Sequence, residues 1–216
     1  MPPAARRSRN FTGRGYAFAT IDYRLVPAAR VEDSAQDVAD AVAWLVAHAA
    51  ELGIDPGKVV LMGHSAGAHL SALVGTDPRY LRKAGLGLDR LSGVVLLDGA
   101  AYDVPAQLAE GPRIMQRTYE QAFGSDSARQ RTLSPTWQAA APNAPAFLVL
   151  HVQRDDGERQ SKALAAALRR AGTRVDLHGF EGRGLRGHMQ INRSLGDPDY
   201  PATQVVDDWI GATLRR

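Results

Sequence analysis

Residues 63 to 67 read Gly-His-Ser-Ala-Gly and contain the first side chain that could do covalent chemistry. An apolar run, residues 59–62, precedes them, and small and apolar residues follow. A serine directly after a buried strand, between two glycines, is typical of a strained strand-to-helix turn that exposes its hydroxyl group. The N–H groups at the start of the next helix would stabilise a developing oxyanion, with that of Ala66 as the expected donor. We therefore predict that Ser65 is a nucleophile.

The two glycines have a steric role in this interpretation. At positions two before and two after the nucleophile, neighbouring backbone is expected to approach so closely that a side chain on Gly63 or Gly67 would clash. The alternative is a serine that only caps a helix, since the pattern also arises by chance in a chain with 21 glycines. The strand, turn and helix around it favour the nucleophile.

A nucleophilic serine needs a base and a carboxylate that orients the base, here in the chain order serine, acid, histidine. His188 lies late in the chain, in a predicted glycine-rich loop, EGRGLRGHMQ, before the last helix, and is the predicted base. Asp155 and Asp156 follow an apolar run at residues 146–152, at the carboxyl end of a predicted strand, where open α/β sheets bind their ligands. Two earlier carboxylates, Asp98 and Asp103, are minor alternatives.

Other side chains are candidates for contact with substrate. His64 adjoins Ser65, and Tyr102 lies in a long segment that follows the third predicted strand. Tyr119 and Trp137, in the same segment, could also line a pocket, although burial in a core explains aromatic residues equally well.

The elements that must position these residues alternate between strand and helix patterns. Nearly all-apolar strands of this kind indicate a parallel sheet covered by helices on both faces, which is the α/β class. We predict strands at residues 16–23, 59–62, 93–97, 146–152 and 174–180, and helices at about 32–52, 65–74, 158–171 and 202–214.

We expect residues 1–216 to form a single domain with one interruption. Residues 100–144 contain four prolines, scattered helical signals and no clear strand. A segment of this length inside an α/β domain is usually a lid or a wall of a binding site.

Composition excludes several classes of function. The net charge is only +3 and no dense basic tract is present, so a nucleic-acid partner is not expected. No apolar stretch approaches the roughly 20 residues that span a bilayer. The chain has no cysteine, and its basic start is followed by no apolar signal segment, so we expect a cytoplasmic protein. No metal or organic cofactor motif is present, so none is expected.

Four stretches, DYRLVP at 22–27, GHSAGAHL at 63–70, GVVLLDGAAYDV at 93–104 and GHMQINRSLG at 187–196, together resemble α/β-hydrolase esterases. The branch is that of hormone-sensitive-lipase-like and kynurenine-formamidase-like enzymes. The resemblance covers about residues 14–214 and implies Ser65 as nucleophile and His188 as base. The family's strand-end pattern H-G-x-x-D falls on residues 151–155, which favours Asp155 as the acid, although valine replaces its glycine.

The sequence departs from this family in one respect. Such esterases carry an H-G-G-G segment whose backbone N–H groups complete the oxyanion hole, and the residues before Tyr16 contain none. We therefore expect a fold truncated at its N-terminus and weak activity, with residues 13–15 or 100–105 as candidate replacement donors. A strand lost from inside the sheet would leave an unpaired edge, so a homodimer or higher oligomer is expected.

The expected function is that of a serine carboxylesterase that hydrolyses short-chain or aryl esters through an acyl-enzyme. An inactive, ligand-binding hydrolase and a formamidase-type amidohydrolase are the alternatives.

Overall fold

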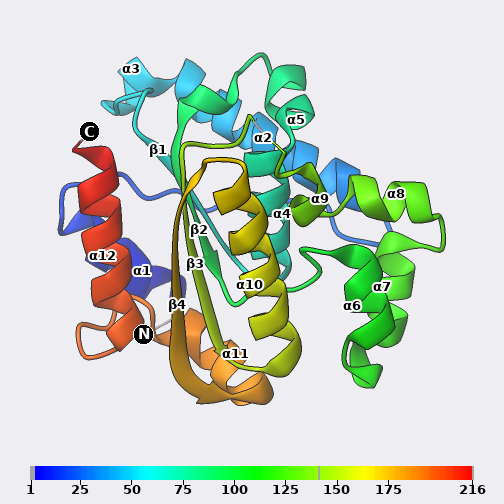
Figure 1. The fold of residues 1–216 in the computed structure, drawn as a ribbon. Helices are drawn as coiled ribbons and strands as arrows, with labels where there is room; N and C mark the ends of the chain where they lie inside the picture. The colour runs from blue at the N-terminus through cyan, green and yellow to red at the C-terminus, as the bar shows by residue number, and fades with distance from the viewer. Residues whose placement is uncertain (1–2, 141, 216) are drawn as a thin grey trace.

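The computed structural model describes residues 3–140 and 142–215 and is built around one parallel sheet (Figure 1). Its strands are adjacent in chain order, β1-β2-β3-β4, and every neighbouring pair is parallel. Because the carboxyl ends of parallel strands meet at one edge, residues that follow different strands can share a site. The strands are β1 (Val59–His64), β2 (Leu91–Leu97), β3 (Ala146–Gln153) and β4 (Arg174–Arg183).

Side chains of the strands pack into two hydrophobic cores, one on each face of the sheet. Along β2, Val94 and Leu96 enter the first core, and Val95 and Leu97 enter the second. This alternation follows from the two-residue period of a strand, and burial of both faces explains the continuous apolar runs. The sequence-based α/β prediction is confirmed.

Helices close both faces, as Figure 1 shows from the side of the sheet. The first core is covered by α2 (Val31–Ala47), α4 (Ala66–Thr76) and α10 (Asp155–Arg170). The second core is covered by α1 (Pro3–Thr12), α12 (Pro201–Leu214) and part of α11 (Gly184–Ser194).

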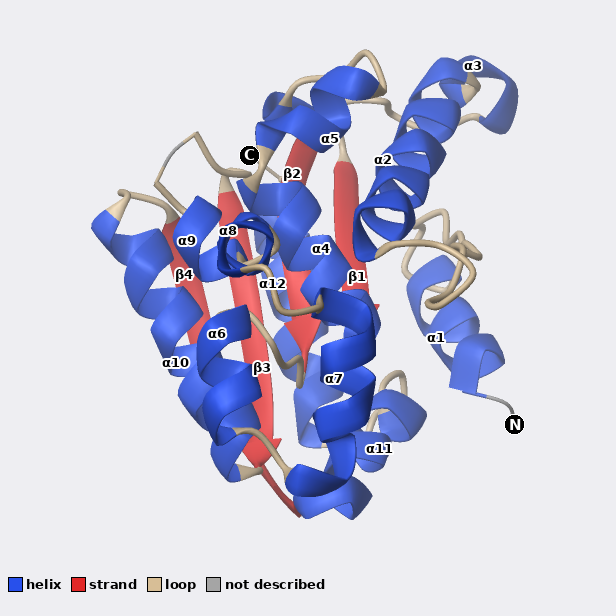
Figure 2. Ribbon diagram, turned by 90° about the vertical axis from the view of Figure 1, so that its right-hand side faces the viewer, coloured by secondary structure: helices blue, strands red, loops and turns tan. Residues whose placement is uncertain are grey.

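The segment at residues 100–144 folds into short helices and contains no strand in the residues that the structure describes. Two of them, α6 and α7, stand apart from the sheet in Figure 1, beyond α4 and α10, and lie in front of it in Figure 2. Its helices are α6 (Val104–Glu110), the 3-10 turn η2 (Arg113–Met115), α7 (Gln116–Phe123), α8 (Ser127–Thr132) and α9 (Pro135–Gln138). The remaining short elements are α3 (Ala49–Leu52), α5 (Pro78–Lys83) and the 3-10 turn η1 (Leu88–Arg90).

The predicted strand at residues 16–23 is wrong, because this segment has neither strand nor helix structure. Its alternating pattern has another cause. Tyr16 and Phe18 pack against the second core, whereas Tyr23 and Val26 pack against the first. The segment thus carries the chain from α1 on one face to α2 on the other, and it pairs with no strand.

As a result, β1 is an edge strand, at the right-hand margin of the sheet in Figure 2. All six of its residues are half-buried, whereas β2 and β3 are almost entirely buried. Along its outer side, no strand pairs with β1 in the described residues.

Candidate active site

The turn between β1 and α4 holds Ser65 in an unusual backbone conformation. Its φ of 56° and ψ of −119° lie in a region that residues with a side chain rarely adopt. Such strain, about 1 to 3 kcal/mol, persists only where the surroundings enforce it. Here the Ser65 N–H donates to the carbonyl of Leu97 at 3.2 Å, which continues the β1–β2 pairing, while the Ser65 carbonyl accepts the first hydrogen bonds of α4.

The two flanking glycines differ in what they do. A Cβ on Gly63 would lie 2.1 Å from the carbonyl oxygen of Gly67, so only glycine fits at position 63. A Cβ on Gly67 would have nothing within 4 Å. The predicted steric role is therefore confirmed for Gly63 and wrong for Gly67, whose hydrogen faces open space next to Ser65.

This contrast predicts opposite outcomes for two small substitutions. Gly63→Ala should lower the free energy of unfolding by at least about 3 kcal/mol, because the clash is with backbone that cannot rotate away. Gly67→Ala should change it by less than about 1 kcal/mol, because alanine favours the helix. Urea denaturation of the two variants checks this, and equal losses of stability would contradict the geometry.

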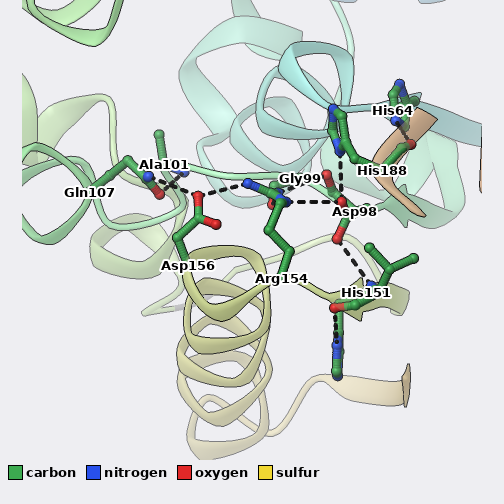
Figure 3. Close-up of polar contacts among 10 residues, drawn as sticks. His64, Asp98, Gly99, Ala101, Gln107, His151, Arg154, Asp156 and His188 are labelled. Atoms are coloured by element: carbon green, nitrogen blue, oxygen red, sulfur yellow. Dashed lines mark hydrogen bonds and ion pairs between the residues drawn. The ribbon is translucent and has the colours of Figure 1, made fainter. Parts of the chain in front are cut away.

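His188 and a buried carboxylate form the central pair of the site, shown in Figure 3. His188 lies on the helix α11, so the predicted loop at this position is wrong. Its Nδ1 is 2.6 Å from Oδ2 of Asp98, the residue that directly follows β2. Asp98 is completely buried, and its other oxygen accepts the N–H of Val152 at 3.1 Å. Because Nδ1 is engaged with the carboxylate, Nε2 is the nitrogen left to accept a proton.

The environment keeps this carboxylate ionised. Burial alone would raise the pKa of Asp98, but the hydrogen bond with His188, the charge of Arg154 and the N–H of Val152 together hold its pKa below the ordinary value. At neutral pH, Asp98 is thus a negative charge placed directly behind His188.

The predicted acid, Asp155, is not the partner of His188. It is exposed and is the first residue of α10, where a negative charge complements the helix dipole. The alternative, Asp156, is buried but pairs with Arg154 at 2.7 Å and with Gln107. The pattern at the end of β3 was misleading because the helix starts at once and carries both aspartates away from α11. Asp98, one of the minor alternatives, directly follows the apolar strand β2, and this position is the sequence signal that indicates it as the acid.

His64, predicted to contact substrate, contacts α11. Its Nε2 is 2.8 Å from the carbonyl oxygen of His188, and the two rings lie 4.4 Å apart. Burial, followed by the neighbouring charge of His188, lowers the pKa of His64 to about 4, so the ring is neutral at pH 7 and can donate to this carbonyl through Nε2. His64 therefore ties α11 to β1, and its contact with substrate stays a prediction.

Tyr102 is a core residue, which corrects its predicted role in substrate binding. The side chain is completely buried, and a Cβ on Gly99 would lie 2.1 Å from its hydroxyl oxygen. The absence of a side chain at position 99 thus makes room for the ring. Of the other aromatic candidates, Tyr119 packs against the first core and Trp137 is exposed, with its indole N–H on Asp103.

A polar cleft of about 400 Å³ lies beside this network, between the 100–144 segment and α10. Arg154 stands between the cleft and Asp98. Most of the residues that line the cleft are charged or polar: Glu110, Gln153, Arg154, Asp155, Asp156 and Arg159, with Pro112 and Gly184 completing the lining.

Comparisons with known proteins find esterases among the similar sequences and structures. The BD-FAE family model matches residues 4–85. Esterase LipC of Mycobacterium tuberculosis is 31% identical over 150 residues, which cover 66% of this chain and 37% of that protein. The crystal structure of esterase B from Lactobacillus rhamnosis superposes with a TM-score of 0.77 at 21% identity, over 98% of this chain and 70% of the other.

The chain has the α/β-hydrolase fold and is similar in sequence to esterases. The resemblance inferred from the four sequence stretches is thereby confirmed. A second relative, a probable isoprenylcysteine alpha-carbonyl methylesterase of Arabidopsis thaliana, is 28% identical over 79% of this chain and 39% of its own length. The chain thus spans about two fifths of the length of these curated relatives.

The two segments predicted to supply a second oxyanion donor have most of their backbone N–H groups engaged in other hydrogen bonds. In residues 13–15, all three N–H groups donate to carbonyls of α1. In residues 100–105, three N–H groups are also engaged: those of Ala101, Asp103 and Val104 donate to the side chains of Gln107, Gln160 and Ser134. Residues 13–15 therefore offer no ready replacement for the family's usual donor, and in residues 100–105 only the N–H groups of Ala100 and Tyr102 are left to serve as one.

In residues 3–140 and 142–215, no group of three or more histidine, cysteine, aspartate or glutamate side chains is arranged to hold a metal ion. Across the same residues, no helix is both long enough and apolar enough to cross a membrane.

Proposed function

We propose that this protein is a serine carboxylesterase in which Ser65 is the nucleophile, His188 the general base and Asp98 the orienting carboxylate. The observation that carries the proposal is the 2.6 Å contact of His188 with buried Asp98, at the same sheet edge as the strained Ser65 turn. A completely buried carboxylate bound to a histidine at the carboxyl ends of the strands serves catalysis better than it serves stability.

The proposed reaction proceeds by acyl transfer. His188 Nε2 takes the proton of Ser65 as Oγ attacks the ester carbonyl, and Asp98 stabilises the imidazolium that forms. The proton then goes to the leaving alcohol, and the acyl-enzyme is hydrolysed by a water that His188 activates. No hydrogen bond joins Ser65 Oγ to His188 within the described residues, as is common for catalytic contacts in the absence of substrate.

The Ala66 N–H, the first of α4, is the proposed oxyanion donor. Loss of one of two such donors lowers the rate by about 10² to 10³-fold. Short-chain and aryl esters are the expected substrates, because a good leaving group tolerates a weak oxyanion hole.

A second candidate, a hydrolase that binds or is acylated without turnover, is favoured by the engaged N–H groups of residues 13–15 and 100–105. The two candidates separate in one experiment: hydrolysis of p-nitrophenyl acetate, together with labelling by a fluorophosphonate and mapping of the labelled peptide. Turnover with the label on Ser65 supports the esterase, and labelling without turnover supports the second candidate. An unlabelled Ser65 rejects the esterase and leaves only a hydrolase that binds a ligand without being acylated. A parallel assay on a formyl amide would show the formamidase activity that was the remaining alternative.

We further propose that the protein forms a homodimer through the open edge of β1. An apolar edge strand with unpaired main-chain groups favours pairing with a second copy. The irregular segment that crosses from α1 to α2 adds exposed apolar side chains, Ile21 and Leu25, to this side of the molecule.

Sedimentation velocity at micromolar concentration should accordingly show a dimer. The double variant Ile21→Lys/Leu25→Lys should sediment as a monomer, because it places charges on the expected interface. Ile114→Lys, at an even more exposed apolar position on the 100–144 segment, is the control and should leave the dimer intact. A monomeric wild-type protein would rule out this interface.

A further inference from the structure

Arg154 lies behind the pair formed by Asp98 and His188, at the junction of β3 and α10 (Figure 3). Its side chain is only 15% exposed. The guanidinium contacts four acceptors: Oδ2 of Asp98 at 3.2 Å, Oδ2 of Asp156 at 2.7 Å, and the carbonyl oxygens of Gly99 and Asp98 at 3.1 and 3.4 Å.

The surroundings leave room for this arrangement. A Cβ on Gly157 would lie 2.7 Å from Nη2 of Arg154, so the absence of a side chain in the first turn of α10 admits the guanidinium. Asp156, which is also buried, is itself fixed by the side-chain amide of Gln107 at 3.2 Å. Arg154 is thus held in one orientation from two sides.

The contacts place alternating charges in a row. His188 and Arg154 both donate to the same oxygen of Asp98, Oδ2, and Asp156 lies on the far side of Arg154. The two donors share the lone pairs of this one oxygen. The fixed positive charge of Arg154 also weakens the attraction that Asp98 exerts on a protonated His188. The charge on Asp156 partly offsets this effect of Arg154.

We propose that Arg154 is a positioning residue that holds the Asp98 carboxylate toward His188 and, balanced by Asp156, sets how readily His188 takes up a proton. This inference deepens the proposed function and rests on it. Neither of the predicted acids pairs with His188, yet Asp156 acts on the site through the arginine that precedes it.

Several other groups face this network and must be held constant in a test. They are His64 on β1, Arg7 on α1, Tyr102 and Tyr119 in the 100–144 segment, and Tyr200 before α12.

The decisive measurement is an NMR titration of the His188 imidazole in the Ser65→Ala protein, with the signal assigned by comparison with Ser65→Ala/His188→Gln. This readout does not need turnover. In this background, Arg154→Met should raise the pKa of His188 by about one pH unit, because a nearby positive charge is removed. Asp156→Asn should lower it by about half a unit, because the charge of Arg154 is then no longer offset.

Arg154→Lys separates charge from geometry. It keeps the positive charge, so the pKa of His188 should stay within about 0.3 units of the parent, but it loses the planar fork that holds Asp98. With Ser65 restored, kcat for p-nitrophenyl acetate should then fall about tenfold while KM is unchanged, because only the orientation of the base is impaired.

Shifts of opposite sign in Arg154→Met and Asp156→Asn support the inference. Unchanged titration of His188 in both variants overturns it, since a merely structural arginine would alter stability without moving this pKa. If Arg154→Met fails to fold in a melting experiment, the Asp156→Asn and Arg154→Lys variants still test the inference. Absence of hydrolysis by the wild-type protein would reject the proposed function, whereas the titration would still report on Arg154.

Discussion

Replacing Asp98 with asparagine should lower kcat for ester hydrolysis about 10⁴-fold, as loss of the orienting carboxylate does in serine hydrolases. The reason lies in the contact of its Oδ2 with Nδ1 of His188. An amide in its place removes the charge that stabilises the imidazolium and no longer fixes the ring tautomer. Steady-state kinetics with p-nitrophenyl acetate measure the effect.

The matched control is Asp155, the aspartate that the sequence favoured. Asp155→Asn should leave kcat within about twofold of the wild type, because the residue is exposed on α10 and surface substitutions have small effects. Asp98→Asn should still fold, because the φ of 43° at this position is one that asparagine adopts readily. A large loss in Asp155→Asn together with an active Asp98→Asn would reverse the assignment of the acid.

Ser65→Ala and His188→Gln should each abolish turnover, with kcat lower by about 10⁴ to 10⁶-fold. The double variant should be no worse than either single one, because the two side chains act as a unit in the proton transfer. Ser65→Ala should also lose fluorophosphonate labelling completely, whereas His188→Gln should slow labelling, since the hydroxyl remains but its base is gone.

His64→Gln is the control for the histidine. Glutamine can still donate to the carbonyl of His188, so this variant should keep activity within about tenfold of the wild type. If His64→Gln were as inactive as His188→Gln, the neutral, buried histidine would have to take part in the chemistry, and the proposed division of roles would be wrong.

The positions of most elements could be read from hydrophobic periodicity. The runs at residues 59–62 and 146–152 are buried strands because both sheet faces are covered, and a continuous apolar run followed by a turn signal is a local property of the chain. The glycine at position 63 likewise marks the turn at Ser65, because the need to avoid a clash with nearby backbone acts within a few residues.

The segment at residues 16–23 shows where this reasoning fails. Its alternating apolar residues match a strand, but a strand exists only when another strand accepts its hydrogen bonds. In the structure the same residues instead anchor the chain to the two cores in turn. Pairing is a property of the neighbours, which the local pattern does not contain.

By itself, the sequence determined the α/β class, the positions of the four strands along the chain and the placement of Ser65 on a strand-to-helix turn. Each of these depends on residues only a few positions apart. Only the tertiary structure decided that Asp98 meets His188, that Arg154 joins this carboxylate to Asp156, and that Tyr102 is buried. These contacts link residues far apart in the chain. They depend on where β3 stops, how α10 begins and which way α11 faces, and packing of the whole sheet fixes all three.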